Sequence, residues 1–185
     1  MGLALTFPSS AGTRQFTLGE ILSETKAVVH GVVVDQFSQW EEYDGHKIVF
    51  TYSTVRVQAA DFRGISPSRQ VVVRTVGGKV GDYQQVLVDE ASFRLGEEVI
   101  VFLGVEDGWL HPSVVGFRQG KYGVARDGSG RILGVRQDAG QQLEPAQGEV
   151  APLIPLARFL EDMRRTRRNL AEGDTSDVHP LVPVR

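Results

Sequence analysis

The feature that most constrains this fold is a run of five apolar residues, Val99 to Leu103, bounded by glycines. Gly96 lies three residues before the run, and Gly104 follows it directly. A continuous apolar run of this length, rich in β-branched residues, is typical of a strand buried on both faces. The sequence therefore predicts a central strand over residues 98–103, with the other strands arranged around it.

The composition favours an all-β fold. Glycine accounts for 21 of the 185 residues, above its usual share of about 7%. Excess glycine between short valine-rich runs indicates turns between strands. A chain of this length can bury about two-thirds of its unfolded surface, so it needs no disulfide or metal to fold.

Several further strands follow from the pattern of apolar and polar residues. They are predicted over residues 27–36, 47–60, 70–76, 83–88, 109–115, 119–125 and 131–135. Gly31 marks a bend or bulge in the first of them, a feature that helps a small barrel to close. Residues 37–46 contain an Asp-Gly pair and are predicted to be a long hairpin tip. The expected architecture is a closed or nearly closed β-barrel with extra β-hairpins.

Helices are predicted at both ends of the chain. Thr17 and Glu20 fit a capping box, which indicates a short helix over residues 18–25. Four apolar residues near the C-terminus share one helical face and predict an amphipathic helix docked on the barrel; they are Leu156, Phe159, Leu160 and Met163. The expected organisation is a single domain: a barrel over residues 1–135, a linker over 136–150, the helix over 151–170 and an extended tail over 171–185.

Charge and residue usage exclude several functional classes. The net charge is −3, and no strongly basic stretch occurs in the first 150 residues, which argues against a duplex nucleic-acid partner. The absence of cysteine excludes thiol catalysis and cysteine-ligated zinc. No apolar run reaches the roughly 18 residues of a transmembrane segment. The four histidines lack the spacing of a local metal site, so no metal or cofactor is predicted.

No pattern in the sequence specifies a reaction. Adjacent carboxylates such as Glu97 and Glu98 point to opposite faces of a strand and cannot act together on one bond. No serine occupies a G-x-S-x-G elbow. The chain is therefore predicted not to be an enzyme, with no catalytic residues. The alternative is a hydrolase in which His30 or His111 meets a carboxylate from a distant part of the chain.

Glycines and exposed aromatic residues are the candidates for binding. The bend at residues 77–81 could hold an anion, but no helix pattern follows it, so a turn between strands is favoured. Aromatic residues on loops are costly at a surface unless they pack or bind. The predicted binding residues are Trp40, Tyr43, Gly77, Gly78, Lys79 and Trp109. The arginines among residues 164–168 either are stabilised by the dipole at the C-terminal end of the helix or bind an acidic partner.

Several segments together resemble a family of small, uncharacterised exported bacterial proteins. The segments are VVHGVV at 28–33, Trp40, IVFTYSTVRV at 48–57, Gly64, VGG at 76–78, FRLGEEVIVFL at 93–103 and QGKYGV at 119–124. The resemblance implies export to the periplasm, cell surface or medium after removal of a signal peptide, and it carries no catalytic residues. The core also resembles the oligonucleotide-binding (OB) type five-stranded barrel of netrin-like and tissue metalloproteinase inhibitor domains. Those inhibitors use an N-terminal cysteine, which this chain lacks, so that activity is not expected.

The functional hypothesis is a non-catalytic, exported binding or adaptor module. Its barrel loops would contact a protein or a cell-surface component, with residues 40–43 and 77–81 as the contact region. Two alternatives stay open: the hydrolase described above, and an OB-type module that binds single-stranded nucleic acid on the barrel face.

Overall fold

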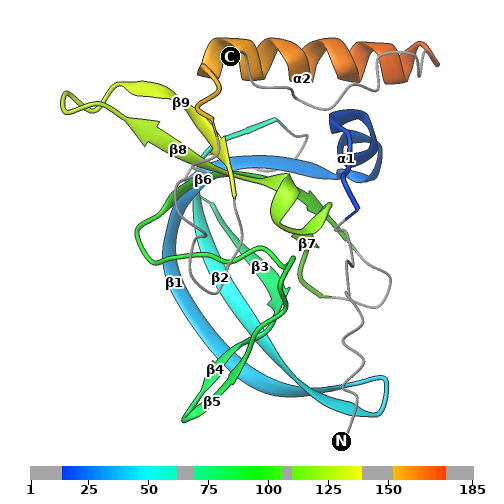
Figure 1. The fold of residues 1–185 in the computed structure, drawn as a ribbon, viewed down its shortest axis with the longest axis vertical. Helices are drawn as coiled ribbons and strands as arrows, with labels where there is room; N and C mark the ends of the chain where they lie inside the picture. The colour runs from blue at the N-terminus through cyan, green and yellow to red at the C-terminus, as the bar shows by residue number, and fades with distance from the viewer. Residues whose placement is uncertain (1–13, 62–68, 106–109, 139–151, 174–185) are drawn as a thin grey trace, which may run out of the picture.

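The computed structural model is mainly β, with a short helix near the N-terminus and a longer one near the C-terminus (Figure 1). It describes residues 14–61, 69–105, 110–138 and 152–173. Most of the predicted loop over residues 61–69, most of the linker and most of the tail lie outside these ranges. The helices are α1 (Leu18–Glu24), the 3-10 helix η1 (Phe117–Gly120) and α2 (Leu156–Ala171).

One large antiparallel sheet holds most of the strands. Its order is β3-β2-β1-β6-β8-β9, with β7 also paired to β6. The bounds are β1 Ala27–Tyr43, β2 His46–Asp61, β3 Gln70–Val76, β6 Glu98–Gly104, β7 Ser113–Val114, β8 Lys121–Arg126 and β9 Ile132–Gln137. A separate two-stranded sheet consists of β4 (Gly78–Val80) and β5 (Tyr83–Gln85).

The central strand is confirmed. Every residue from Val99 to Leu103 is at most 5% exposed. Alternate side chains enter two different cores: Val99, Val101 and Leu103 pack in one, and Ile100 and Phe102 in the other. β6 is therefore buried on both faces, because strands β1 and β8 flank it and packed layers cover both of its sides.

The prediction of a long hairpin tip over residues 37–46 is wrong. Strand β1 continues to Tyr43, β2 begins at His46, and only Asp44 and Gly45 form the turn, both with positive φ. Cross-strand aromatic packing explains the extension: Phe37 lies opposite Tyr52, and their rings stack with centroids 5.1 Å apart. The result is a long, curved hairpin that runs down the molecule (Figure 1).

Other predicted strands differ mainly in length. The strand expected over residues 83–88 is only β5, and the one expected over 109–115 is only β7. Strand β9 runs to Gln137, two residues into the expected linker. Strand β8 begins at Lys121, whose buried ammonium lies 2.8 Å from a Glu97 carboxylate oxygen. Among the described strands, β4 and β5 pair only with each other, and they form a separate hairpin that packs against β1 and β2.

A closed barrel is not confirmed. Among the described residues, the strand pairings form an open path from β3 to β9 with β7 as a branch. One backbone hydrogen bond of 2.9 Å, from Arg74 N–H to the carbonyl of Pro112, links β3 to the residue before β7. This bond brings β3 into contact with the start of β7, but the two strands are not paired with each other.

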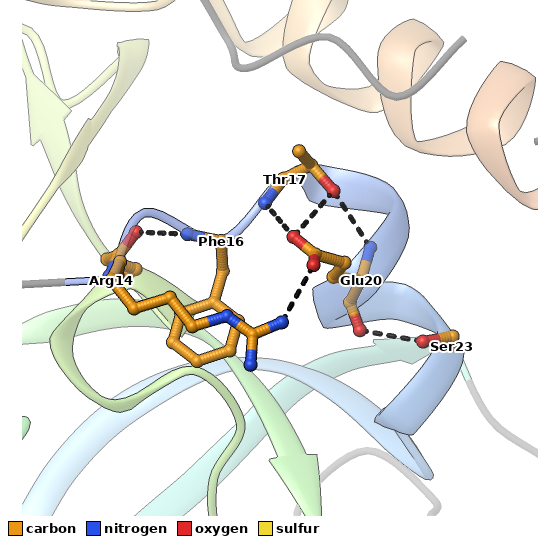
Figure 2. Close-up of polar contacts among 6 residues, drawn as sticks. Arg14, Phe16, Thr17, Glu20 and Ser23 are labelled. Carbon is orange, nitrogen blue, oxygen red and sulfur yellow. Dashed lines mark hydrogen bonds and ion pairs between the residues drawn. The ribbon is translucent and has the colours of Figure 1, made fainter. Parts of the chain in front are cut away.

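The N-terminal helix forms as the capping pattern predicts. The Thr17 hydroxyl accepts from the Glu20 N–H, and the Glu20 carboxylate accepts from the Thr17 N–H (Figure 2). The segment before the helix is held by the buried side chain of Gln119, which donates to the Arg14 carbonyl and accepts from the Phe16 N–H. These bonds fix α1 against η1.

The C-terminal helix packs through its apolar stripe. Phe159 is fully buried and its ring lies 4.7 Å from that of Tyr122 on β8. Met163, one turn further on, belongs to the same core, together with Leu18 and Ile21 of α1. Both helices thus cover the outer face of β6 and β8, where α2 crosses the top of the molecule in Figure 1.

Gly31 bends β1 as predicted, and its replacement should destabilise the fold. The register with β2 shifts between His30 and Gly31, and a Cβ at Gly31 would lie 2.4 Å from the Arg56 carbonyl oxygen. We expect Gly31→Ala to lower the free energy of unfolding by about 1–3 kcal/mol, as overpacking does. Urea denaturation measures the effect. Gly128→Ala, where a Cβ meets nothing within 4 Å, should match the wild type; equal losses would contradict the explanation.

Candidate functional site

A polar cavity of about 240 Å³ lies where the chain leaves β3. Its walls come from β1, β2, the end of β3, the β4–β5 hairpin and the segment before β6. The predicted binding residues Gly77, Gly78 and Lys79 all line it. The glycine bend is therefore part of a real hollow, although it forms a turn between strands, as the sequence favoured, because Gly78 and Lys79 enter β4.

Close packing explains why glycines occupy this bend. Gly78 has a φ of 135°, and a Cβ there would lie 2.2 Å from the Thr51 hydroxyl and 2.5 Å from the Ser38 hydroxyl. These two hydroxyls are hydrogen-bonded at 2.8 Å, and Thr51 donates to the Gly77 carbonyl at 2.6 Å. The backbone thus approaches a hydrogen-bonded wall that leaves no space for a side chain.

Gln36 adds a further polar group to the lining of the cavity. The side-chain amide of Gln36 donates to the Ser53 hydroxyl at 3.0 Å and to the Phe93 carbonyl at 3.1 Å. A primary amide also offers acceptor lone pairs on its oxygen, and that oxygen makes no protein hydrogen bond within the described ranges. The two bonds hold the Gln36 side chain in one orientation and leave its amide oxygen to accept a hydrogen bond from a ligand.

An exposed aromatic pair lies beside the cavity. Trp40 and Tyr83 are 42% and 51% exposed, and their ring centroids are 4.8 Å apart. Trp40 shares a strand face with Gln36 and Ser38, because alternate residues of a strand point the same way. Tyr83 adjoins Gln84, which lines the cavity. The pair therefore extends the polar hollow with an apolar surface.

The other predicted aromatic residues lie elsewhere. Tyr43 is on the opposite face of β1, with its ring edge-on to Phe50 at 6.1 Å. It lines a neighbouring hollow of about 230 Å³, which shares Thr75, Val76, Leu87 and Glu90 with the polar cavity. Trp109 lies outside the described residues. The structure thus brings together Trp40 and the glycine bend, but it does not bring Tyr43 to them.

A charged cluster occupies that opposite face. Arg74 Nη2 lies 2.8 Å from Glu41 Oε2, the Tyr52 hydroxyl donates to the other Glu41 oxygen, and the Arg74 guanidinium lies 3.7 Å above the Phe50 ring. Burial opposes ionisation of Glu41, but hydrogen bonds from Gln39 and Tyr52 and the charge of Arg74 hold its pKa below the usual range. Burial and the bond to Glu41 raise the pKa of Tyr52. The cluster is charge-compensated and ties β1, β2 and β3 together.

His30, one of the two histidines named for the hydrolase alternative, has a carboxylate partner. His30 Nε2 lies 2.8 Å from Glu98 Oε1, and Arg126 bonds the same carboxylate through Nε and Nη2, both at 2.6 Å. The bonds from Arg126 and, less strongly, from His30 hold the pKa of Glu98 below its usual range despite its burial. A carboxylate held by three donors is a poor proton acceptor, so this arrangement favours a structural role.

Within the described ranges, no group of three or more histidine, aspartate or glutamate side chains is placed to hold a metal ion. Neither α1 nor α2 is long and apolar enough to cross a bilayer. His179 lies outside the described residues.

Sequence reasoning missed several cavity residues. They are Gln36, Ser38, Thr51, Thr75, Gln84, Gln85 and the aromatic Tyr83. The sequence offers one signal for these residues: Gln36, Ser38 and Trp40 are alternate residues and would share one face of a strand. This pattern indicates a common site only if β1 is known to extend through residue 40. The residues of β2 and β5 join the site through tertiary packing. Comparison with models of known families, with curated proteins and with solved structures finds no match.

The carboxylate of Glu98 should make stability depend on pH. Since its pKa is lowered in the folded state, its contribution is present above the unfolded-state pKa of about 4.3 and is lost as the pH falls through the folded-state value. As the pH is lowered from neutral into the acid range, we expect the free energy of unfolding of Glu98→Gln to fall less than that of the wild type. Urea titrations across that range measure it. Exposed Glu161→Gln should keep the wild-type slope, and an unchanged slope in Glu98→Gln would contradict the assignment.

Proposed function

We propose that this chain is an exported, non-catalytic binding module. Its ligand enters the polar cavity at Gly77 to Lys79 and stacks against Trp40 and Tyr83. The observation that carries the proposal is the combination of a preformed polar hollow with an exposed aromatic pair at its side. Binding sites combine a few fixed polar groups with apolar contact surface in this way.

The chemistry of the lining favours an uncharged, hydroxyl-rich ligand. Most polar groups there are hydroxyls and carboxamides, from residues such as Gln36, Ser38 and Thr51. The charged residues are one lysine and one glutamate, Lys79 and Glu90, so neither sign of ligand charge is favoured. An aromatic face suits the apolar face of a sugar ring. We therefore propose a saccharide of a cell surface as the ligand.

A fold-level analogy adds weight to this proposal. We propose that the sheet is an OB-like barrel in which β3 meets the β7 edge, supported by the hydrogen bond from Arg74 to Pro112. In barrels of that type the loop between the first two strands takes part in binding oligosaccharides and oligonucleotides. Trp40 lies near the corresponding β1–β2 turn. Because one fold can host many functions, the cavity and its aromatic pair carry the proposal, and the OB-like arrangement only supports it.

The two alternative functions have weaker support. For a hydrolase, the His30–Glu98 pair exists, but Arg126 holds the carboxylate. For single-stranded nucleic acid, the exposed aromatics are suitable stacking surfaces, yet the cavity contributes a single lysine beside a glutamate. A backbone-tracking site needs a basic groove.

A tryptophan reporter tests the proposal directly. Trp40 and Trp109 are the two tryptophans, so Trp109→Phe leaves Trp40 as the only one. This variant is titrated with neutral oligosaccharides of glucose, mannose or N-acetylglucosamine. We expect the fluorescence of Trp40 to change saturably with one of these three classes. In the same background Tyr83→Ala should weaken binding about tenfold, the scale of a lost aromatic contact. Leu133→Ala, on β9, should bind as the parent does.

Two results would contradict the assignment. An equal loss of affinity in Tyr43→Ala, on the opposite face, would place the ligand across the hairpin tip instead of in the cavity. Saturable binding of a single-stranded oligonucleotide that weakens steeply with salt, without saccharide binding, would favour the nucleic-acid alternative.

A further inference from the structure

A buried lysine with two carboxylate partners lies at the start of β8. The side chain of Lys121 is only 4% exposed. Its ammonium nitrogen Nζ lies 2.8 Å from Glu97 Oε1 and 3.2 Å from Asp138 Oδ2. None of these three residues lines the polar cavity, so the chemistry of this cluster is independent of the proposed function.

The backbone of the sheet holds these groups together. β8 and β9 are antiparallel, and just beyond their paired register the Asp138 N–H donates to the Lys121 carbonyl at 2.9 Å. Lys121 and Asp138 are therefore direct cross-strand neighbours, with side chains on the same face. Glu97 directly precedes β6, the other neighbour of β8, and its Oε2 accepts from the Arg94 N–H at 3.1 Å. The lysine is thus held between one carboxylate on each side.

Burial makes the charges of this cluster costly. Lys121 is the group most removed from water, and the centroid of the Phe93 ring lies 5.2 Å from its Nζ. The attraction within a buried ion pair often fails to offset the loss of hydration of both ions. Conversion of the lysine and one carboxylate into an amide would remove both charges. The amide N–H would still donate to the second carboxylate.

From this arrangement we propose that Lys121 and Asp138 condense into an intramolecular isopeptide bond. A bond forms between Nζ and the carboxyl carbon Cγ, and the bond between Cγ and one carboxylate oxygen breaks. That oxygen leaves as water with two of the three ammonium protons, and the amide nitrogen keeps the third. Atoms and charge therefore balance without an oxidant, a reductant or a second reactant.

Glu97 is the catalytic residue of this condensation. Its Oε1 is in contact with Nζ, so it accepts a proton as the nitrogen becomes nucleophilic and returns it to the leaving oxygen. Reactants held in contact reach effective molarities of about 10⁵–10⁸ M, which favours a condensation that a free amine and a free carboxylate do not undergo in water. The product joins β8 to β9 covalently in a chain that has no cysteine for a disulfide.

Intact-mass spectrometry of the denatured wild-type chain tests the proposal. We expect a mass that is lower than that of the sequence by one water molecule. Since a lysine in an amide is not cleaved by trypsin, the digest should contain residues 119–126 joined to residues 137–158. Lys121→Arg, which retains the charge but cannot form this amide, should have its full sequence mass.

Two carboxamide variants test the role of the carboxylate. Glu97→Gln should fold, as judged by circular dichroism, and should keep its full sequence mass because the proton acceptor is gone. Glu98→Gln is the matched control: it changes the adjacent carboxylate, which bonds to His30 and Arg126 instead of Lys121, and should lose water as the wild type does. If Glu97→Gln does not fold, the wild-type mass and the peptide map decide the proposal by themselves.

Several results would overturn the proposal. One is a folded wild-type chain with its full sequence mass. Another is a loss of water that persists in Lys121→Arg, because it would then come from a succinimide at an Asp-Gly pair such as Asp127-Gly128. A cross-linked peptide that joins Lys121 to Glu97, or a folded Glu97→Gln chain that still loses water, would overturn the assigned roles.

Discussion

Burial of β6 on both faces is the constraint on which the rest of the structure depends. Val99, Val101 and Leu103 enter one core, and Ile100 and Phe102 enter the other. Each such side chain contributes about 1.5–3 kcal/mol when fully buried, but only if a packed layer exists on its own side. The chain therefore has to supply two layers. The β1–β2–β3 strands wrap around one face, while α1 and α2 cover the other.

Two hollows lie where these layers are incomplete. On the side covered by β1, β2 and β3, the sheet extends beyond its apolar core into the polar residues Gln36, Ser38 and Thr51, and the β4–β5 hairpin packs over them. On the helical side, Phe159 fills the core, and a hollow of about 520 Å³ remains between α2 and the sheet. The core stabilises the scaffold, and the elements added at its margins supply the hollows.

The sequence predicts those parts of the fold that local pattern determines. The apolar run of β6, the capping box of Thr17 and Glu20, and the bend at Gly31 each have a local physical cause, and each is found. The sequence predicts a hairpin tip over residues 37–46 but not the continuation of β1 to Tyr43, because polar and aromatic residues occupy both faces there and remove the alternation that marks a strand. Pairing between Phe37 and Tyr52 decides its structure, and that contact is tertiary. The contact of Tyr83 with Trp40 and the hollow beneath α2 are not predictable for the same reason, since both depend on which elements pack together.

Native-state hydrogen exchange tests the central claim most directly, because it measures how strongly each strand is held. The account predicts that the amides of β6 and of residues 27–32 of β1, which pair with β6, exchange slowest and only through global unfolding. The β4–β5 hairpin, paired with no other strand in the described structure, should exchange faster through local opening. Exchange of β6 as fast as that of β4 and β5 would contradict the claim that the fold is built around this strand.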